Sequence, residues 1–257
     1  MSRVDVLGTA IDNVSLDEAL ASIMEKVEAR EYSYAVTPNV DHVMRLRRDQ
    51  DLRSIYDRAD FVLADGVPLV WASALLHARL KGRVNGTDLL EGLCASAAAR
   101  GLSVFLLGGD PGTADRAGER LSRRFRGLRV AGAACPSASD VKDVEANRRL
   151  QTAIQTSGAD ILFVGLGSPK QERWIARYAR QTGVSFAVGI GVSFSFVAGD
   201  IARAPVWMQR CGLEWLWRLA MEPRRLWKRY LVDDAPFVWL IGKELASRRL
   251  TAVRRAR

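Results

Sequence analysis

The stretch DILFVGLGSPKQERWIARYARQ, residues 160–181, contains a buried strand, a turn and a helix in that order. Residues 160–167 form a nearly continuous apolar run, which is typical of a strand covered on both faces of a parallel sheet. A glycine-rich turn follows, and residues 169–181 then show the amphipathic pattern of a helix. Because parallel strands need a crossover of this kind between them, the unit predicts the architecture of the whole chain.

The same order of elements recurs on both sides of this stretch. Short apolar runs predict further strands at residues 4–8, 32–37, 61–64, 103–108, 128–132 and 185–191. Amphipathic stretches predict helices at residues 15–30, 39–48, 87–100, 113–125 and 141–157. The first of these begins with Ser15 and Glu18 at the spacing of a capping box. The alternation predicts an α/β fold with a mainly parallel sheet and helices on both of its faces.

The last part of the chain differs from the rest in composition. The protein has 257 residues and a net charge of +9. Residues 201–257 hold 13 Lys/Arg and 5 Asp/Glu, which is +8, and five of the seven Trp. Strand patterns stop near Arg203, and Pro223 and Pro236 interrupt the helical pattern. We therefore predict a core at residues 1–202 and a basic, Trp-rich appendage of two or three helices at residues 203–257.

This appendage suits an anionic partner, such as phosphate, nucleic acid or an acidic membrane. An ordinary solvated helical surface with a few core Trp is the alternative. We expect removal of the chain from Ile201 onward to abolish the function of the appendage while the core stays folded.

The composition disfavours several classes of protein. Cys94, Cys135 and Cys211 are odd in number and form no CxxC motif, so a reducing compartment is expected. The first residues have no apolar stretch of the kind found in signal peptides. The uncharged run at residues 181–199 is nearly long enough to span a membrane, but its glycines and serines fit a buried strand and a loop better.

A metal site is not expected either. The chain has two histidines, His42 and His77, and neither belongs to a sequence cluster of His, Cys or carboxylates. Asp49 and Asp51 spell DxD, the metal–nucleotide signature of some glycosyltransferases. In the charge-dense stretch RRDQDLR they fit a solvated turn or a helix N-cap better.

Polar and glycine residues lie at the ends of several predicted strands. In chain order they are Thr37 and Asn39, then Asp65, then Gly108 and Gly109, then GLGSPKQE at residues 165–172. Ligands of open α/β sheets bind beyond the carboxyl ends of the strands, so these residues predict a cleft there. The two glycine-rich turns offer backbone N–H groups to phosphate, and they place Gly108, Gly109, Gly167 and Lys170 near it. Neither turn has the GxGxxG or GK[ST] spacing of a nucleotide-binding motif.

Eight motifs resemble those of one enzyme family. In order along the chain they are TPNVDHV, ADG, RVNGTDLL, VFLLGG, GLGSPKQE, RAPVWM, GLEWLWRL and EPRRLWKRY. The set resembles the WecG/TagA/CpsF glycosyltransferases, glycosyltransferase family 26, from about Leu7 to Tyr230. The resemblance implies a Rossmann-like fold of the GT-E type. It also implies an inverting, metal-independent transfer, without a cofactor, from a UDP-sugar to a polyprenyl-diphosphate-linked acceptor. The sugar that the resemblance implies is N-acetylmannosamine, its uronic acid or another hexose.

The resemblance also assigns roles to particular residues. Asp65 of ADG matches the catalytic base. Four residues match positions of the substrate pocket: Thr37, Asn39, Arg83 and Gln171. Arg218 and Arg225 match arginines that close over the site and hold the diphosphate, and a third basic position falls at Lys228 or Arg229.

Elementary chemistry supports these roles but leaves alternatives. Partial burial beside Phe61 and Val67 would raise the pKa of Asp65 above the ~3.9 of a free carboxyl and make it a better base. Asp65 could instead cap the following helix or form an Asx turn with Gly66. Guanidinium groups suit phosphate oxygens, although arginines are also common on solvated surfaces, and Pro223 separates Arg218 from Arg225.

Beyond Tyr230 the resemblance fades. The apolar residues there and just before, at Trp227 and 237–241, and the arginines at 248, 249, 254, 255 and 257 fit attachment to a membrane surface rather than a span. We therefore expect a cytoplasmic protein attached peripherally to the inner face of the cytoplasmic membrane. Its expected partners are a UDP-sugar donor, a lipid-linked saccharide acceptor and an anionic membrane surface. Nucleic acid is not expected, and a homo-oligomer is left open.

Two other functions are less favoured. An NAD-dependent oxidoreductase would need GxGxxG after the first strand, where VDVLGTAID supplies a single glycine. A non-enzymatic membrane or nucleic-acid adaptor would use the basic appendage, but it leaves the polar residues at the strand ends without a role.

Overall fold

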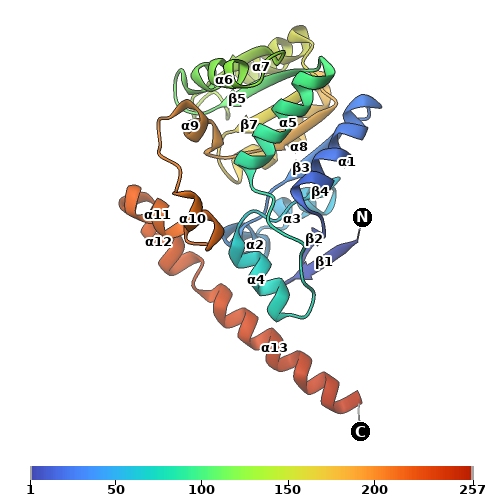
Figure 1. The fold of residues 1–257 in the computed structure, drawn as a ribbon, viewed down its shortest axis with the longest axis vertical. Coiled ribbons are helices and arrows are strands. Elements are labelled where there is room, and N and C mark those ends of the chain that lie inside the picture. The colour runs from blue at the N-terminus through green and yellow to red at the C-terminus, as the bar shows by residue number, and fades with distance from the viewer. Residues whose placement is uncertain (1, 256–257) are drawn as a thin grey trace.

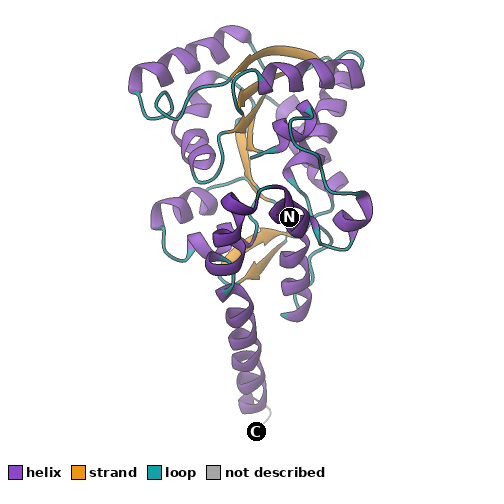
Figure 2. Ribbon diagram, turned by 90° about the vertical axis from the view of Figure 1, so that its left-hand side faces the viewer, coloured by secondary structure: helices purple, strands orange, loops and turns teal. Residues whose placement is uncertain are grey.

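A six-stranded parallel sheet forms the centre of the protein (Figures 1 and 2). The computed structural model describes residues 2–255, and their side chains except those of Arg225 and residues 248–255. In spatial order the strands are β4 (Phe61–Val62), β3 (Ser33–Val36), β8 (Phe186–Gly189), β7 (Ile161–Gly165), β5 (Ser103–Gly108) and β6 (Arg129–Ala134). All five neighbouring pairs are parallel, which confirms the predicted fold class.

Helices cover both faces of the sheet because side chains alternate along each strand. Ala35 and Phe61 point into one apolar cluster, whereas Val36 and Val62 point into the other. The first cluster is closed by α1 (Leu16–Glu28), α5 (Gly86–Arg100), α6 (Thr113–Arg124) and α9 (Ser193–Ala198). The second is closed by α2 (Val40–Leu46), α3 (Gln50–Asp57), α4 (Val67–Leu75), α7 (Val144–Ser157) and α8 (Lys170–Tyr178), which runs on into the 3-10 turn η1 (Ala179–Thr182).

Several features differ from the sequence prediction. The predicted strand at residues 4–8 is β1 (Arg3–Val6), which pairs with an unpredicted β2 (Thr9–Asp12) in a separate antiparallel hairpin. Helices α3 and α4 were not among the predicted helices, and α9 lies within residues 181–199, where a strand and a loop were expected. His77, which we also expected within a helix, lies just after α4 with a positive φ of 57°. The predicted capping box at Ser15 and Glu18 is present in full.

The DxD sequence caps α3. Asp49 is the N-cap, and its carboxylate accepts a hydrogen bond from the backbone N–H of Leu52 at 2.9 Å. The other oxygen of Asp49 is paired with Arg173 at 2.6 Å. The prediction of an N-cap is therefore confirmed.

The chain after residue 203 is helical, but it forms more pieces than predicted. They are α10 (Val206–Arg210), α11 (Glu214–Met221), α12 (Pro223–Lys228), the π-helical segment η2 (Arg229–Asp233) and α13 (Pro236–Arg255). As expected, the helix breaks at Pro223. Figure 1 shows α13 leaving the body of the molecule, and its first turns bury Phe237 and Ile241 in the second apolar cluster. Within the described residues, no helix is both long enough and apolar enough to cross a membrane.

Candidate active site

The carboxyl ends of β4, β3 and β8 lie next to one another and bring together residues that are far apart in the sequence. The backbone N–H of Asp65 donates to the carbonyl of Pro38 at 2.7 Å, so the loops after β4 and β3 run side by side. The hydroxyl of Thr37 donates to the carbonyl of Gly189 at 3.1 Å, which joins β3 to β8 beyond the last strand pair. Asp65 and Thr37 therefore lie at one edge of the sheet, as the sequence predicted.

Asp65 does not cap the helix that follows it. The N-cap of α4 is Gly66, with φ of 118°, and none of the described side chains caps this helix. Burial and, to a lesser extent, the nearby carboxylate of Glu214 raise the pKa of Asp65 to about 7, against the opposing effect of Arg218, Arg83 and Arg229. The carboxyl thus lies in a poorly solvated place within the field of three arginines, two of them from the appendage.

Arg83 links the body to the appendage. Its guanidinium group donates to Glu214 of α11 at 3.0 Å and to the side chain of Gln209 of α10 at 3.4 Å. A second link runs from Arg203 to Asp88 at 2.7 Å. These contacts hold α10 and α11 beside the loop that carries Asp65.

Arg229 makes the closest described contact between the appendage and the polar strand ends. It donates to the side-chain oxygen of Asn39 at 3.1 Å and lies 3.4 Å from the carboxylate of Asp41. Asn39 is also the N-cap of α2 and accepts from the backbone N–H of His42. Lys228, the other candidate for this basic position, is exposed at the end of α12.

The remaining arginines of the appendage differ in how they are placed. Arg218 of α11 has its guanidinium carbon 6.0 Å from the centre of the Phe196 ring, and its charge lowers the pKa of Asp65. The side chain of Arg225, to which the sequence assigned a phosphate contact, lies outside the described residues.

Gln171 is buried and holds the loop after β8. Its side-chain oxygen accepts from the backbone N–H of Gly191 at 3.0 Å, and its amide nitrogen donates to Glu172 at 2.9 Å. Glu172 is 1% exposed, and its second oxygen has no hydrogen-bond partner among the described residues. Both polar ends of the Gln171 side chain are therefore used in contacts within the protein, whereas Lys170 beside it is exposed.

The glycines of the two turns allow a close approach of neighbouring strands. A Cβ on Gly108 would lie 2.5 Å from the backbone of Gly165, and the N–H of Gly109 donates to the carbonyl of Gly165 at 3.0 Å. Gly167 has a φ of 73° with open space around it, and its carbonyl accepts from the N–H of Gln171. The turns after β5 and β7 are therefore joined, next to β8 and its loop.

Several residues at this edge were not predicted as site residues. Glu214 raises the pKa of Asp65, and Asp41 pairs with both Arg45 and Arg229. His42 is buried, its pKa is lowered by burial, and its Nδ1 lies 3.2 Å from the carbonyl of Thr37. Asp41, His42 and Glu214 belong to the quoted motifs TPNVDHV and GLEWLWRL, which was the signal available for them.

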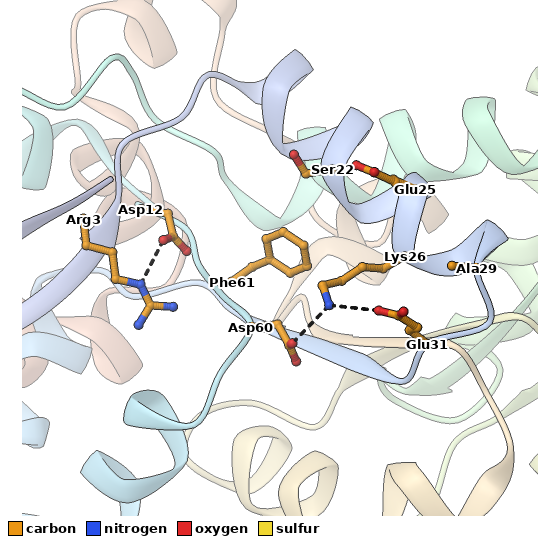
Figure 3. Close-up of a pocket in the computed structure, with 9 residues that line it drawn as sticks. All are labelled: Arg3, Asp12, Ser22, Glu25, Lys26, Ala29, Glu31, Asp60 and Phe61. Carbon is orange, nitrogen blue, oxygen red and sulfur yellow. Dashed lines mark hydrogen bonds and ion pairs between the residues drawn. The ribbon is translucent and has the colours of Figure 1, made fainter. Parts of the chain in front are cut away.

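A separate hollow of about 480 Å³ lies at the opposite edge of the sheet, near the start of β4 (Figure 3). Lys26 is paired there with Glu31 at 3.6 Å and with Asp60 at 3.7 Å, and Arg3 is paired with Asp12 at 2.9 Å. The lining has two basic side chains against four acidic ones, Asp12, Glu25, Glu31 and Asp60, so its net charge of −2 does not suit a phosphate. Across residues 2–255, no three or more His, Cys, Asp or Glu side chains are grouped so as to hold a metal ion.

Comparison with known proteins explains why these residues converge. Residues 4–251 match the model of the glycosyl transferase WecG/TagA/CpsF family. The chain belongs to this family. The match covers the body with its strand-end residues and most of the appendage, so the WecG/TagA/CpsF architecture includes both sides of the site.

Relatives of the WecG/TagA/CpsF family with a named activity align over most of their length. The N-acetylglucosaminyldiphosphoundecaprenol N-acetyl-beta-D-mannosaminyltransferase of Bacillus spizizenii (strain ATCC 23059 / NRRL B-14472 / W23) is 32% identical over 221 residues, 84% of this chain and 83% of the relative. The protein of the same name from Bacillus subtilis (strain 168) is 31% identical over 195 residues, 76% of this chain and 73% of the relative. That from Staphylococcus aureus (strain MW2) is 28% identical over 230 residues, 89% of this chain and 87% of the relative. The chain is thus a glycosyltransferase, as the motifs predicted.

Proposed function

We propose that this enzyme transfers N-acetylmannosamine from a UDP-linked donor to a hydroxyl of N-acetylglucosaminyl-diphosphoundecaprenol or a similar polyprenyl-diphosphate-linked sugar. The names of the three relatives support this choice of sugar and acceptor. Asp65 carries the proposal, because a half-buried carboxyl among arginines at the strand ends provides both a base and cationic groups at one place.

In the proposed reaction, the acceptor hydroxyl oxygen attacks the anomeric carbon of the donor sugar. Its proton passes to Asp65 as the new carbon–oxygen bond forms. The bond between the anomeric carbon and the diphosphate oxygen breaks with its electron pair, and UDP leaves from the opposite face. A single displacement of this kind inverts the anomeric configuration. The raised pKa of Asp65 supports its role as a base, because proton transfer is most efficient when the pKa lies near the working pH.

The leaving diphosphate gains negative charge in this step, and we propose that arginines stabilise it without a metal ion. The electrostatic effect of Arg218 and Arg83 on the pKa of Asp65 supports a role near the reacting groups, as does the contact of Arg229 with Asn39. Guanidinium groups bind phosphate oxygens through two parallel hydrogen bonds, which suits this task. Arg225 remains a candidate for the same role on the basis of the motif EPRR alone.

We further propose a division of labour and a location. Residues 1–202 supply the base and the wall of the donor site, and residues 203–257 close over it and contact the anionic face of the cytoplasmic membrane. The charge of +8 at residues 201–257 and the exposed Trp207, Trp227 and Trp239 support such a surface contact.

A transfer assay tests the proposal. The full-length protein is mixed with a short-chain N-acetylglucosaminyl-diphospholipid and, separately, with UDP-N-acetylmannosamine, its uronic acid analogue and UDP-glucose. With the first donor we expect a product larger by one N-acetylhexosamine. NMR should show that the anomeric configuration of the transferred sugar is inverted. The rate of transfer should be the same in the presence of EDTA. Absence of product with every UDP-sugar would contradict the proposed function, and loss of the rate in EDTA would contradict the metal-independent mechanism.

A further inference from the structure

Helix α4, in the catalytic body, exposes an apolar face to solvent. Its sequence, VPLVWASAL, contains no charged residue. Trp71 is 52% exposed and Leu75 is 55% exposed, and their spacing of four places them on one side of the helix. Leu69 and Ala72 are buried against the core. Helix α4 is therefore packed against the core through one side, and Trp71 and Leu75 lie on its solvent-exposed side.

This face continues into the appendage. Gly212 lies in the turn between α10 and α11, and a Cβ on it would be 2.9 Å from both Trp71 Cη2 and Val67 Cγ1. On either side of that turn, Trp207 is 60% exposed and Trp215 is 37% exposed. Outside α4 and the appendage, Val144 is the one strongly exposed large apolar side chain among those that the structure describes. Apart from Val144, the strongly exposed large apolar side chains that the structure describes therefore lie on α4 and on the appendage.

Basic side chains follow α4. Residues 66–87 contain Arg79, Lys81 and Arg83 and no Asp or Glu, but Lys81 is paired with Glu18 and Arg83 with Glu214, so Arg79 is the basic residue here whose charge no described ion pair offsets. Arg79 and Lys81 are exposed just after the helix ends. Exposed Trp and Leu side chains next to basic ones are typical of protein segments that lie at the surface of an anionic bilayer.

The position of α4 next to Asp65 indicates a role for this surface. Asp65 is separated from the first residue of α4 by Gly66 alone, and a helix of nine residues is roughly 14 Å long. The diphosphate of a polyprenyl-linked acceptor lies at the level of the lipid headgroups, so the base must come within reach of that level.

From these observations we infer that α4 is a bilayer contact of the catalytic body. Trp71 and Leu75 enter the headgroup boundary of an anionic leaflet and hold Asp65 at the level of the acceptor diphosphate. This inference rests on the proposed lipid-linked acceptor. It differs from attachment through the appendage alone, because α4 belongs to the catalytic body itself.

The test uses the full chain with Leu75→Glu, Trp71→Glu and, as a matched control, Val144→Glu. Each is assayed for co-sedimentation with vesicles of phosphatidylglycerol and phosphatidylcholine, and for transfer to a long-chain acceptor in those vesicles and to a short-chain, water-soluble acceptor. We expect the two α4 variants to lose about tenfold in vesicle binding and in transfer to the vesicle acceptor, because a carboxylate would have to enter the lipid boundary. Their transfer to the soluble acceptor should stay within about twofold, and Val144→Glu should match the wild type throughout.

The outcomes separate the inference from the proposed function. Vesicle binding that is unchanged in both α4 variants would overturn the inference, as would an equal loss of transfer to both acceptors. A wild-type dimer that Leu75→Glu converts to monomer would also overturn it, because the face would then join two copies of the chain. If the wild type transfers sugar to neither acceptor, the proposed function fails, whereas vesicle binding still decides the role of α4. Leu75→Gln, which adds no charge, should show a smaller loss in the same direction and guards against a folding defect.

Discussion

At the scale of single residues, the environment of Asp65 sets the expected pH dependence. Burial, followed by the charge of Glu214, raises the pKa of its carboxyl to about 7. A general base works only in its ionised form, so the rate should rise about tenfold per pH unit below this midpoint and level off above it. The measurement is kcat/KM for transfer from pH 5 to pH 9.

Asp234 provides a control for this profile, because its pKa is also raised to about 7, mainly by burial. Asp234→Asn should keep the midpoint of the wild type. A profile that is flat from pH 5 to pH 9, or a midpoint that disappears in Asp234→Asn, would argue against Asp65 as the titrating base.

Arg229 and Lys228 are neighbours in the sequence but have different surroundings in the structure. Arg229 reaches Asn39 and Asp41, whereas Lys228 is exposed. Arg229→Ala should lower kcat/KM for transfer by about 10- to 100-fold, because a charged hydrogen bond to the diphosphate is worth about 1.5–3 kcal/mol. Lys228→Ala should stay within about threefold of the wild type, as most exposed charges do. Equal losses in the two variants, measured with the same donor and acceptor, would remove the distinction.

At the scale of elements, the N-terminus of α3 tests the meaning of the DxD sequence. Asp49 accepts from the N–H of Leu52 and pairs with Arg173. Asp49→Ala should lower the free energy of unfolding by about 1 kcal/mol, the usual cost of losing an N-cap, and leave transfer unchanged. Urea denaturation and the transfer assay measure the two effects. A variant of normal stability whose transfer is lost and then restored by Mn²⁺ would show instead that Asp49 serves a metal site.

The elements that could be predicted are those with a strong pattern. Continuous apolar runs located all six strands of the main sheet within a few residues, because a strand covered on both faces must be apolar throughout. Helix α3 was missed because its eight residues, QDLRSIYD, are mostly polar and bury Leu52, Ile55 and Tyr56 alone. Strand β2 was missed because its four residues, TAID, are too short to show a period.

The site could be predicted in part, for a similar reason. Thr37, Asn39 and Asp65 follow strands, so the topology of a parallel sheet brings them to one edge. The contact of Arg229 with Asn39 joins residues 190 positions apart and depends on how the appendage folds back, which no local pattern determines. For the same reason, the sequence could not distinguish Lys228 from Arg229.

At the scale of the whole molecule, the appendage packs against the core. Phe237 and Ile241 of α13 are 6% exposed within the second apolar cluster, and Leu226 of α12 is 3% exposed. A chain ending at residue 202, whose core the sequence analysis expects to stay folded, should therefore lose about 3–6 kcal/mol of its free energy of unfolding with these apolar contacts. The midpoint of urea denaturation measures this loss. A chain ending at residue 247, which keeps all three side chains, is the control, and an equal midpoint for the two truncated chains would contradict the expectation.

The molecule brings Asp65, the proposed base, into the electrostatic field of arginines from the appendage, and Asp65→Asn tests this proposal most directly. The variant keeps the shape of the side chain but cannot accept the proton. We expect single-turnover transfer at pH 8 to fall by about 10²- to 10⁴-fold, while UDP binding measured by calorimetry stays within about twofold of the wild type. Transfer by Asp65→Asn at the wild-type rate would contradict the account.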